Sequence, residues 1–392
     1  MNHIQTPYYV IEQDNLDANF DHLRSALNKH WPNHIVGYSY KTNSLPWLVK
    51  HFQEKGCYAE VVSKDEYELS KLLETKENCL IYNGPIKSKS SFIEAIDRGC
   101  IVNIDSHREL EWISELVKEG LSEYKIGIRA NFDIEKYCPG QSACGEEGGR
   151  FGFCYENGEL KKALDYLSDN NVKVSGLHLH TSSKTREVCI YDAISKIAVE
   201  IATNYNLKLD FIDIGGGFFG GLKTKPQFET YFEIVEANLS NRFSKKETVL
   251  IVEPGMALVG AFVRYVTSVI DVKDTSFNRF IITDGSRTNI DPLMNKSSYS
   301  FEINQSQLTP ILKKQVVCGY TCMEHDRLFV AVDEPEISVG EQIVYNKVGA
   351  YTLCLTPLFI SYFPDVYVET DHGYKLVRAR WNANDYLNSS DR

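Results

Sequence analysis

Three features are scarce or missing in the sequence, and each absence excludes a class of protein. No run is long and apolar enough to cross a bilayer, and the first residues lack the pattern of a signal peptide. Positive charge is in deficit, because 42 Lys and Arg residues stand against 53 Asp and Glu, a net charge of −11. Nucleic acids and anionic membranes attract clustered positive charge, so neither is expected as a partner.

Closely spaced cysteine pairs are also missing. The 10 cysteines are scattered along the chain and include no Cys-x-x-Cys pair. This usage argues against a disulfide framework and a structural zinc site, so no metal is expected. Free thiols that pack in the interior suit a reducing compartment, and we expect a cytoplasmic protein.

A regular alternation of short apolar runs and helix-like segments fills most of the chain. The apolar runs lie at 34–41, 57–62, 79–82, 100–104, 124–130, 172–179, 209–214 and 248–252. Helical periodicity is found at 44–55, 64–74, 88–99, 107–118, 158–169, 187–206 and 226–239. The alternation predicts an α/β fold with a (β/α)8 TIM-like barrel over residues 31–261; an open doubly wound sheet is the alternative.

The two ends of the chain differ from this pattern. Residues 1–30 begin with a short extended piece at 7–11, followed by a helix-like stretch. From residue 262 onward, strand-like runs follow one another with little helix between them, at 261–266, 280–283, 315–317, 328–332 and 342–345. We therefore expect a C-terminal, mostly β domain at 262–392, which the segment 1–30 partly joins.

Polar residues follow the predicted strands, at the end of a barrel where active-site groups gather. Lys41 ends the first apolar run, and such a lysine either pairs with an acid, extends its amine into water or forms a Schiff base. The other strand-end residues are Glu60, Asn83, Arg129, His178, His180, Asp213, Gly215, Gly216, Gly217 and Glu253.

Three of these motifs have alternative interpretations. The glycine run 215–217 is either a phosphate cradle or a tight turn. His180 either faces the rim or is a buried, satisfied histidine. Glu253 either holds a protonated pyridine nitrogen or forms a salt bridge with Arg129. Lysine, phosphate cradle, stacking histidine and carboxylate together are what pyridoxal 5'-phosphate requires of a barrel.

Several motifs resemble the fold-type III pyridoxal-phosphate decarboxylases, the family of diaminopimelate, ornithine and carboxynorspermidine decarboxylases. The motifs are Tyr40-Lys41-Thr42-Asn43, Glu60-Val61-Val62-Ser63, Gly176-Leu177-His178-Leu179-His180, Gly215-Gly216-Gly217, Glu253-Pro254-Gly255, Cys322-Met323-Glu324-His325-Asp326 and Gly349-Ala350-Tyr351-Thr352. They occur in the family's order and extend over nearly the whole chain. The resemblance implies the alanine racemase and decarboxylase fold, a barrel plus a β domain.

The resemblance also implies roles for the residues. Lys41 would hold the cofactor as a Schiff base, His180 would stack on its ring, Glu253 would pair with the pyridine nitrogen, and Cys322 would donate a proton to the product. The residues expected to bind the cofactor are Lys41, Glu60, Arg129, His180, Ser183, Gly215, Gly216, Gly217, Glu253, Gly255 and Tyr351. The family's head-to-tail homodimer would bring Cys322 and Asp326 into the active site of the partner subunit.

The sequence departs from diaminopimelate decarboxylase at the positions expected to hold the substrate. Met256 stands where that enzyme usually has an arginine, Met323 where it usually has a glutamate, and 291–292 is Asp-Pro instead of Arg-Pro. Without those arginines a distal carboxylate loses its charge-assisted bonds, unless Arg287 replaces them. The residues expected to bind the substrate are therefore Arg287, Asp291, Cys322, Met323, Glu324 and Asp326.

These observations predict a decarboxylase that removes the α-carboxylate of a specialised or cationic amino acid. The alternatives are a diaminopimelate decarboxylase of lysine biosynthesis, an amino-acid racemase on the same fold, and a homologue with an inactive site. Racemases of this fold usually lack the Cys-x-x-x-Asp motif, so Cys322 and Asp326 favour decarboxylation.

The segment 132–149 is rich in Gly, Glu and Cys, and we predict that it is a mobile lid when no ligand is bound. Hydrogen exchange followed by mass spectrometry measures this directly. Fast exchange in the segment is the expected result, and protection equal to that of the barrel strands would count against a mobile lid.

Overall fold

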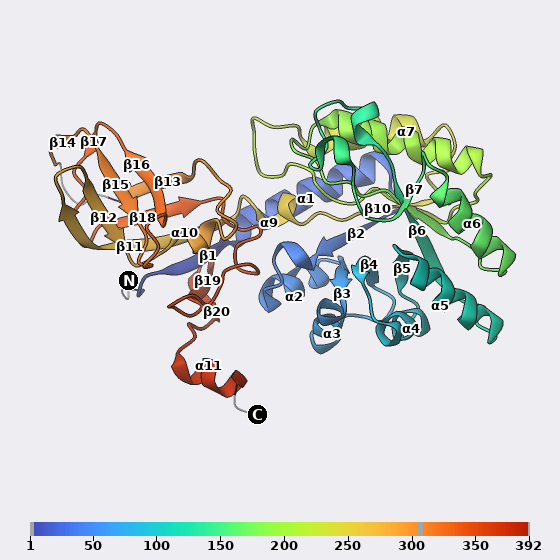
Figure 1. Ribbon diagram of the computed structural model, residues 1–392, viewed down its shortest axis with the longest axis horizontal. Coiled ribbons are helices and arrows are strands. Elements are labelled where there is room, and N and C mark those ends of the chain that lie inside the picture. Colours follow the sequence, from blue (N-terminus) through green and yellow to red (C-terminus); the bar gives the residue numbers. More distant parts are fainter. Residues whose placement is uncertain (1–3, 305–308, 391–392) are drawn as a thin grey trace. The chain divides into compact units, whose positions relative to one another are not determined.

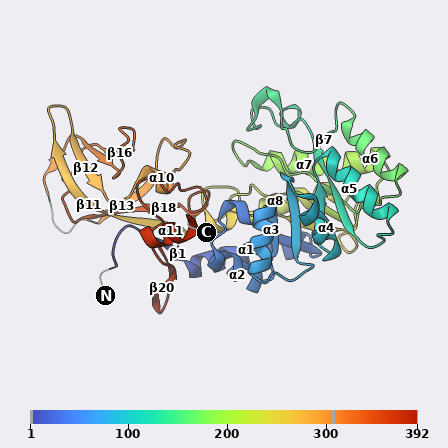
Figure 2. The same cartoon turned by 60° about the horizontal axis from the view of Figure 1, so that its bottom comes forward.

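The computed structural model describes residues 4–304 and 309–390. The chain forms two compact units (Figures 1 and 2). One contains Phe20–Ala257, and the other contains the residues before Phe20 and after Ala257. The first border falls inside a helix, whereas the sequence prediction places the barrel at 31–261.

The larger unit is a closed barrel of eight parallel strands, which confirms the predicted fold. Its strands are β2 (His34–Ser39), β3 (Tyr58–Ser63), β4 (Leu80–Ile86), β5 (Ile101–Ile104), β6 (Lys125–Asn131), β8 (Gly176–His178), β9 (Phe211–Asp213) and β10 (Val249–Val252). Pairing of β5 with β6 closes the sheet, so the open-sheet alternative is wrong. The short strand β7 (Phe153–Cys154) pairs with β6.

Helices surround these strands, as Figures 1 and 2 show. They are α2 (Pro46–Glu54), α3 (Lys64–Leu72), α4 (Lys89–Asp97), α5 (His107–Lys118), α6 (Glu159–Asp169), α7 (Val188–Asn204) and α8 (Phe228–Leu239), with the short turns η1 (Tyr40–Thr42), η2 (Ile134–Lys136) and η3 (Gly145–Glu147). Two helices, α1 (Gln13–His30) and α9 (Met256–Val259), extend across the unit borders. All seven helices predicted between the strands are confirmed.

Local sequence explains where some of these helices begin. The Ser63 hydroxyl accepts a hydrogen bond from the Glu66 N–H at 3.1 Å, and Ser88 does the same for Ser91 at 3.1 Å. Each serine thereby satisfies an N–H that has no partner within its helix, and each fixes the turn from a barrel strand into α3 or α4.

One aromatic ring packs inside the barrel near the amino-terminal ends of its strands. Phe211 packs in a buried cluster with Ile81, Ile101 and Ile251. A Cβ added at Gly176, on the neighbouring strand β8, would overlap the Phe211 ring. A large residue and a glycine on neighbouring strands thus share this layer of the barrel interior.

The smaller unit is a β-sheet structure. Its elements are β1 (Tyr8–Glu12), β11 (Val263–Asp274), β12 (Arg279–Thr283), β13 (Ser300–Asn304), β14 (Ile311–Leu312), β15 (Gln315–Cys318), β16 (Arg327–Ala331), β17 (Glu334–Pro335), β18 (Gln342–Asn346), β19 (Asp365–Thr370) and β20 (Gly373–Arg378), with α10 (Arg287–Ile290) and α11 (Ala383–Ser390). The first strand, β1, runs antiparallel to β11 and parallel to β19.

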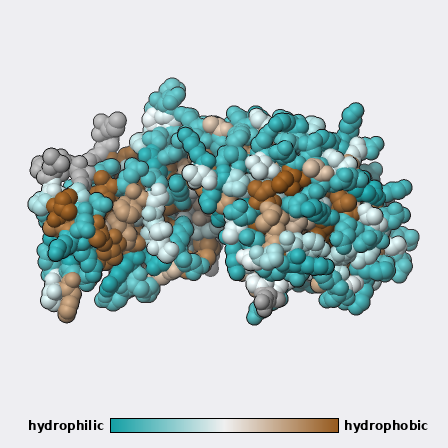
Figure 3. Space-filling view, turned by 90° about the horizontal axis from the view of Figure 1, so that it is seen from above, coloured by the Kyte–Doolittle hydropathy of each residue, from teal (hydrophilic) through white to brown (hydrophobic). Residues whose placement is uncertain are grey.

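The surface and the thiols agree with the composition. Figure 3 shows a mainly hydrophilic face with some hydrophobic surface, and exposed apolar side chains of the smaller unit include Ile270, Phe277 and Val332. All 10 cysteines are free, as expected. Within the described ranges, no helix has both the length and the apolar character that a membrane span requires.

We predict that Gly176→Ala lowers the free energy of unfolding by about 1–3 kcal/mol, because the new methyl group must displace the Phe211 ring. Urea unfolding followed by circular dichroism measures the change. Gly149→Ala is the matched control, since an added Cβ there meets nothing closer than 3.9 Å. Equal stability of the two variants would contradict the tight packing.

Candidate active site at the carboxyl ends of the barrel strands

Lys41 lies in η1, directly after β2, and its amine meets an acid of the next strand. The Nζ atom donates to Glu60 Oε2 at 2.7 Å. Glu60 is fully buried and also accepts hydrogen bonds from Ser39 Oγ at 2.5 Å and Asn83 Nδ2 at 3.0 Å. This ion pair positions the amine at the rim, with about a third of the lysine side chain exposed.

Glu253 follows β10 and belongs to a buried polar cluster. Its Oε1 accepts a hydrogen bond from Asn83 Nδ2 at 2.5 Å, and its Oε2 lies 3.7 Å from His178 Nε2. Asp213, His178 and Glu253 each offer a ligand atom within 4.8 Å of the others. Burial raises the pKa of Glu253, but His178, a hydrogen bond from Asp213, and Lys41 together bring it below the usual range.

His180 follows β8, and its ring packs against the glycine run. The Gly216 N–H donates to His180 Nδ1 at 3.2 Å, so the neutral ring carries its proton on Nε2. Burial, helped by the charges of Arg129 and Lys41, lowers the pKa of His180 to about 3. Gly215 has a φ of +69°, and a Cβ there would overlap the His180 ring. Glycine is thus required where the backbone passes the histidine.

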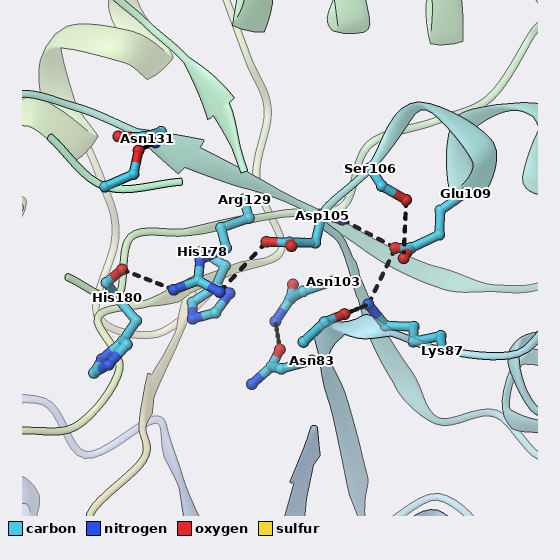
Figure 4. A network of polar contacts seen from close by, with 12 residues as sticks. Asn83, Lys87, Asn103, Asp105, Ser106, Glu109, Arg129, Asn131, His178 and His180 are labelled. Carbon is cyan, nitrogen blue, oxygen red and sulfur yellow. Dashed lines mark hydrogen bonds and ion pairs between the residues drawn. The ribbon is translucent and has the colours of Figure 1, made fainter. Parts of the chain in front are cut away.

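Arg129, on β6, joins two strand ends. Its Nη1 donates to Asp105 Oδ1 at 3.3 Å, and its Nη2 donates to the His180 carbonyl at 3.2 Å (Figure 4). The guanidinium also lies over the Phe151 ring, 4.8 Å from its centroid. The partner of Arg129 is therefore Asp105 and not Glu253, the alternative that the sequence had left open.

A fully buried ion pair, Lys87 with Glu109, holds the backbone of Asp105 in place. Lys87 Nζ donates to Glu109 Oε2 at 3.0 Å and to the Gly84 carbonyl at 2.7 Å. Glu109 in turn accepts from the Asp105 N–H at 3.0 Å and from Ser106 Oγ at 3.1 Å (Figure 4). Both charged side chains of the pair have 0% exposure, and burial lowers the pKa of Lys87.

The remaining barrel residues predicted for the site lie in the same rim loops. A Cβ at Gly255 would overlap the Thr42 side chain, which places the loop after β10 directly against η1. Ser183 forms an isolated β-bridge with Ser142, and this bridge ties the segment 132–149 to the loop after β8. Gly217 has a φ of +97°.

The other predicted residues belong to the smaller unit. Arg287 Nε and Nη2 donate to Asp291 Oδ2 at 3.1 and 3.0 Å. Asp291 is 4% exposed and also accepts from Tyr299 at 2.9 Å and from the N–H groups of Asn295 and Lys296. The two residues predicted to bind opposite charges of a substrate thus bind each other.

Asp326 organises the cysteine loop of this unit. Its carboxylate accepts hydrogen bonds from the Arg287 N–H at 2.8 Å, Ser286 Oγ at 3.0 Å and Thr321 Oγ1 at 2.6 Å. Asp326 is 2% exposed, whereas Cys322 is exposed. The other predicted residues of the unit are Met323, which is partly buried, and Glu324 and Tyr351, which are exposed.

Four residues of the network in Figure 4 were not predicted from the sequence: Lys87, Asn103, Asp105 and Glu109. A signal was present for two of them, because Asp105-Ser106-x-x-Glu109 follows an apolar run and has the spacing of a helix-capping sequence. Lys87 and Asn103 carry no comparable pattern. Their partners are set by the closure of the barrel.

Comparison with known proteins gives the family of this chain. The sequence model of the family described as "Pyridoxal-dependent decarboxylase, pyridoxal binding domain" matches residues 15–260. The chain belongs to this family. It is a pyridoxal-phosphate-dependent amino-acid decarboxylase, a carboxy-lyase, as the sequence predicted.

Similar proteins cover this decarboxylase along nearly its full length. Diaminopimelate decarboxylase of Aquifex aeolicus is 27% identical, over 97% of this chain and 90% of its own. L-glutamyl-[BtrI acyl-carrier protein] decarboxylase of Niallia circulans is 26% identical, over 98% of this chain and 93% of its own. The crystal structure of diaminopimelate decarboxylase from Methanocaldococcus jannaschii with L-lysine has a TM-score of 0.86 at 22% identity, and the match covers 99% of this chain and 92% of that one.

The rim of the decarboxylase barrel suits pyridoxal 5'-phosphate. Lys41 offers a primary amine for the aldehyde, and Glu253 offers a buried carboxylate for the pyridine nitrogen. An added Cβ would overlap the His180 ring at Gly215 and the Glu253 carbonyl at Gly216. Glycine at both positions therefore lets the backbone pass close to these two groups. The buried Nε of Arg129 has no hydrogen-bond partner in the described chain.

Removing one member of the buried pair, as in Lys87→Met or Glu109→Gln, should lower the free energy of unfolding of the decarboxylase by about 3–5 kcal/mol, because one charge stays buried without its partner. The double variant should cost less than either single change. Urea unfolding measures all three. Lys161→Met is the control, since it breaks only an exposed pair with Asp165; single variants as stable as this control would contradict the prediction.

Proposed function

We propose that the decarboxylase acts on diaminopimelate and releases its α-carboxylate as carbon dioxide. The observation that carries the proposal is full-length similarity to diaminopimelate decarboxylases, among them those of Aquifex aeolicus, Oryza sativa and Methanocaldococcus jannaschii. These relatives favour the second of our sequence interpretations over a specialised or cationic substrate.

Each rim residue has a proposed task. When bound, pyridoxal phosphate supplies a ring that accepts the electrons left after loss of the carboxylate. Lys41 would hold the cofactor through its aldehyde, and its bond to Glu60 fixes the amine at the strand end. Glu253 would hold the pyridine nitrogen in its protonated state, and His180, neutral because its pKa is lowered, would stack on the ring.

Two further roles, phosphate binding and proton donation, are assigned to residues by resemblance to the family. The N–H groups of Gly215 and Gly216 already donate to Asp213 Oδ1 and His180 Nδ1, so within the glycine run we assign the phosphate to the Gly217 N–H. By resemblance to the family, Tyr351 would also contact the phosphate. The family's homodimer brings Cys322 of the partner subunit to the substrate, where the thiol donates the proton that replaces the carboxylate. A monomer is then inactive.

Two observations bear on the distal end of the substrate. Arg287 is the cation that we assign to the distal carboxylate, and its bond to Asp291 holds the guanidinium in a fixed orientation. Asp291 itself accepts hydrogen bonds from its own unit, which does not favour it as an anchor for a free ammonium.

A specialised substrate is the second candidate function. Met256 and Met323 replace the charged residues usual in diaminopimelate decarboxylases, and one relative is a decarboxylase of an L-glutamyl group on an acyl-carrier protein. Methionines at these positions suit a larger or more apolar substrate than diaminopimelate.

Carbon dioxide release separates the two candidates. Purified, cofactor-loaded protein is offered diaminopimelate, L- and D-ornithine, lysine, arginine and carboxynorspermidine in parallel. Turnover of diaminopimelate alone is the expected result, and turnover of a cationic substrate or of none of these compounds would contradict the proposal.

Two lysine variants accompany this assay. Lys41→Ala should lose both turnover and the absorbance of the lysine-bound cofactor, since no other amine takes its place. Lys50→Ala, an exposed position on the following helix, is the matched control and should behave as the unchanged protein.

A further inference from the structure

Three buried carboxylates lie close together beneath the rim, and two asparagines join them. Glu60 and Asp213 have 0% exposure and Glu253 has 4%. Asn83 Nδ2 donates to both Glu60 and Glu253, at 3.0 and 2.5 Å. Asn103 Nδ2 donates to Asn83 Oδ1 at 2.8 Å and to Asp213 Oδ2 at 3.3 Å.

The charges of this cluster do not balance if every acid is ionised. Three carboxylates would then face one ammonium, that of Lys41, which is bonded to Glu60. Asp213 and Glu253 offer ligand atoms within 4.8 Å of each other. Two buried carboxylates at that distance cannot both ionise at low cost, so one proton must stay in the cluster.

His178 is the competing place for that proton. Neither of its ring nitrogens has a hydrogen-bond partner in the described chain, and Nε2 is 3.7 Å from Glu253. An imidazolium would therefore bury an additional N–H donor on Nδ1, which has no acceptor in the described chain, and this costs more than a neutral ring. Burial accordingly lowers the pKa of His178.

The proton is better placed on Asp213. Its Oδ1 already accepts from the Gly215 N–H at 2.9 Å, and a proton on Oδ2 makes it a donor toward Glu253. Burial, the Glu253 charge and the Glu60 charge raise the pKa of Asp213, in agreement with this placement. The backbone bond also ties Asp213 to the start of the glycine run.

We propose that Asp213 is a positioning residue that stays protonated at neutral pH and donates a hydrogen bond to Glu253. The pair then carries a single negative charge, on the carboxylate assigned to the cofactor nitrogen. This consequence for the cofactor rests on the proposed function, whereas the protonation of Asp213 does not.

The first test uses apoprotein labelled with ¹³C-aspartate and infrared difference spectra at neutral pH. A C=O band of a protonated aspartate is expected in the unchanged protein and should vanish in Asp213→Asn. Asp210→Asn, which removes an exposed aspartate three positions earlier, should leave the band in place. Absence of a band that depends on Asp213 overturns the proposal, whatever the substrate of the enzyme.

Thermal unfolding against pH gives an independent test. An aspartate whose pKa is raised by folding stabilises the protein fully below its unfolded pKa of about 4, and this contribution is lost as pH rises above that value. The Tm of Asp213→Asn relative to the unchanged protein should therefore rise with pH above about 4. If the Tm of Asp213→Asn minus that of the unchanged protein is constant or falls with pH, the proposal is overturned.

Cofactor binding tests the positioning role. The amide of Asp213→Asn can still donate to Glu253, so its affinity for pyridoxal phosphate should stay within about threefold, whereas Asp213→Leu should lose about tenfold or more. Equal affinities of these two variants overturn the role. The same cluster could instead bind a cation, and one equivalent of metal in the purified protein, lost in Asp213→Asn, would also overturn the proposal.

Discussion

The carboxyl end of the barrel depends on the pairing of buried charges. Acids and cations from different strands meet there without water to stabilise them, so each must find a partner in the fold. Lys41 has Glu60, Arg129 has Asp105, and Lys87 has Glu109. These pairs join neighbouring strands and helices, and the loops that carry the chemistry take their positions from them.

The three ion pairs differ in solvent exposure, and their roles in the site differ accordingly. Lys87 and Glu109 are sealed from water and orient Asp105 through its backbone N–H. Arg129 donates hydrogen bonds both to Asp105 and to the His180 carbonyl, and so links these two strand ends. Lys41 alone among these cations keeps a third of its side chain exposed at the rim, where a small molecule can reach the amine.

The barrel was predictable from the sequence because parallel strands, buried on both faces, form continuous apolar runs. The strands β13, β19 and β20 were not, since their residues are partly exposed. In addition, β13 and β19 pair with strands remote in sequence, β18 and β1. At the rim, residues directly after strands, such as Lys41 and Glu253, could be found by position. Lys87 could not, because it lies five residues beyond the apolar run 79–82 and its importance comes from contacts with Glu109 and Gly84 that form only in the folded chain.

The pairing of β1 with β19 joins two segments that the ribosome makes far apart in time. Tyr8–Glu12 is made first, yet its parallel partner Asp365–Thr370 is made after every strand of the barrel. The barrel segment can therefore fold while β1 still lacks both neighbours, because β11 also follows the barrel in the sequence, and closing so long a loop is slow. During translation, the unpaired edge of β1 is the part of the nascent chain most in need of protection from wrong partners.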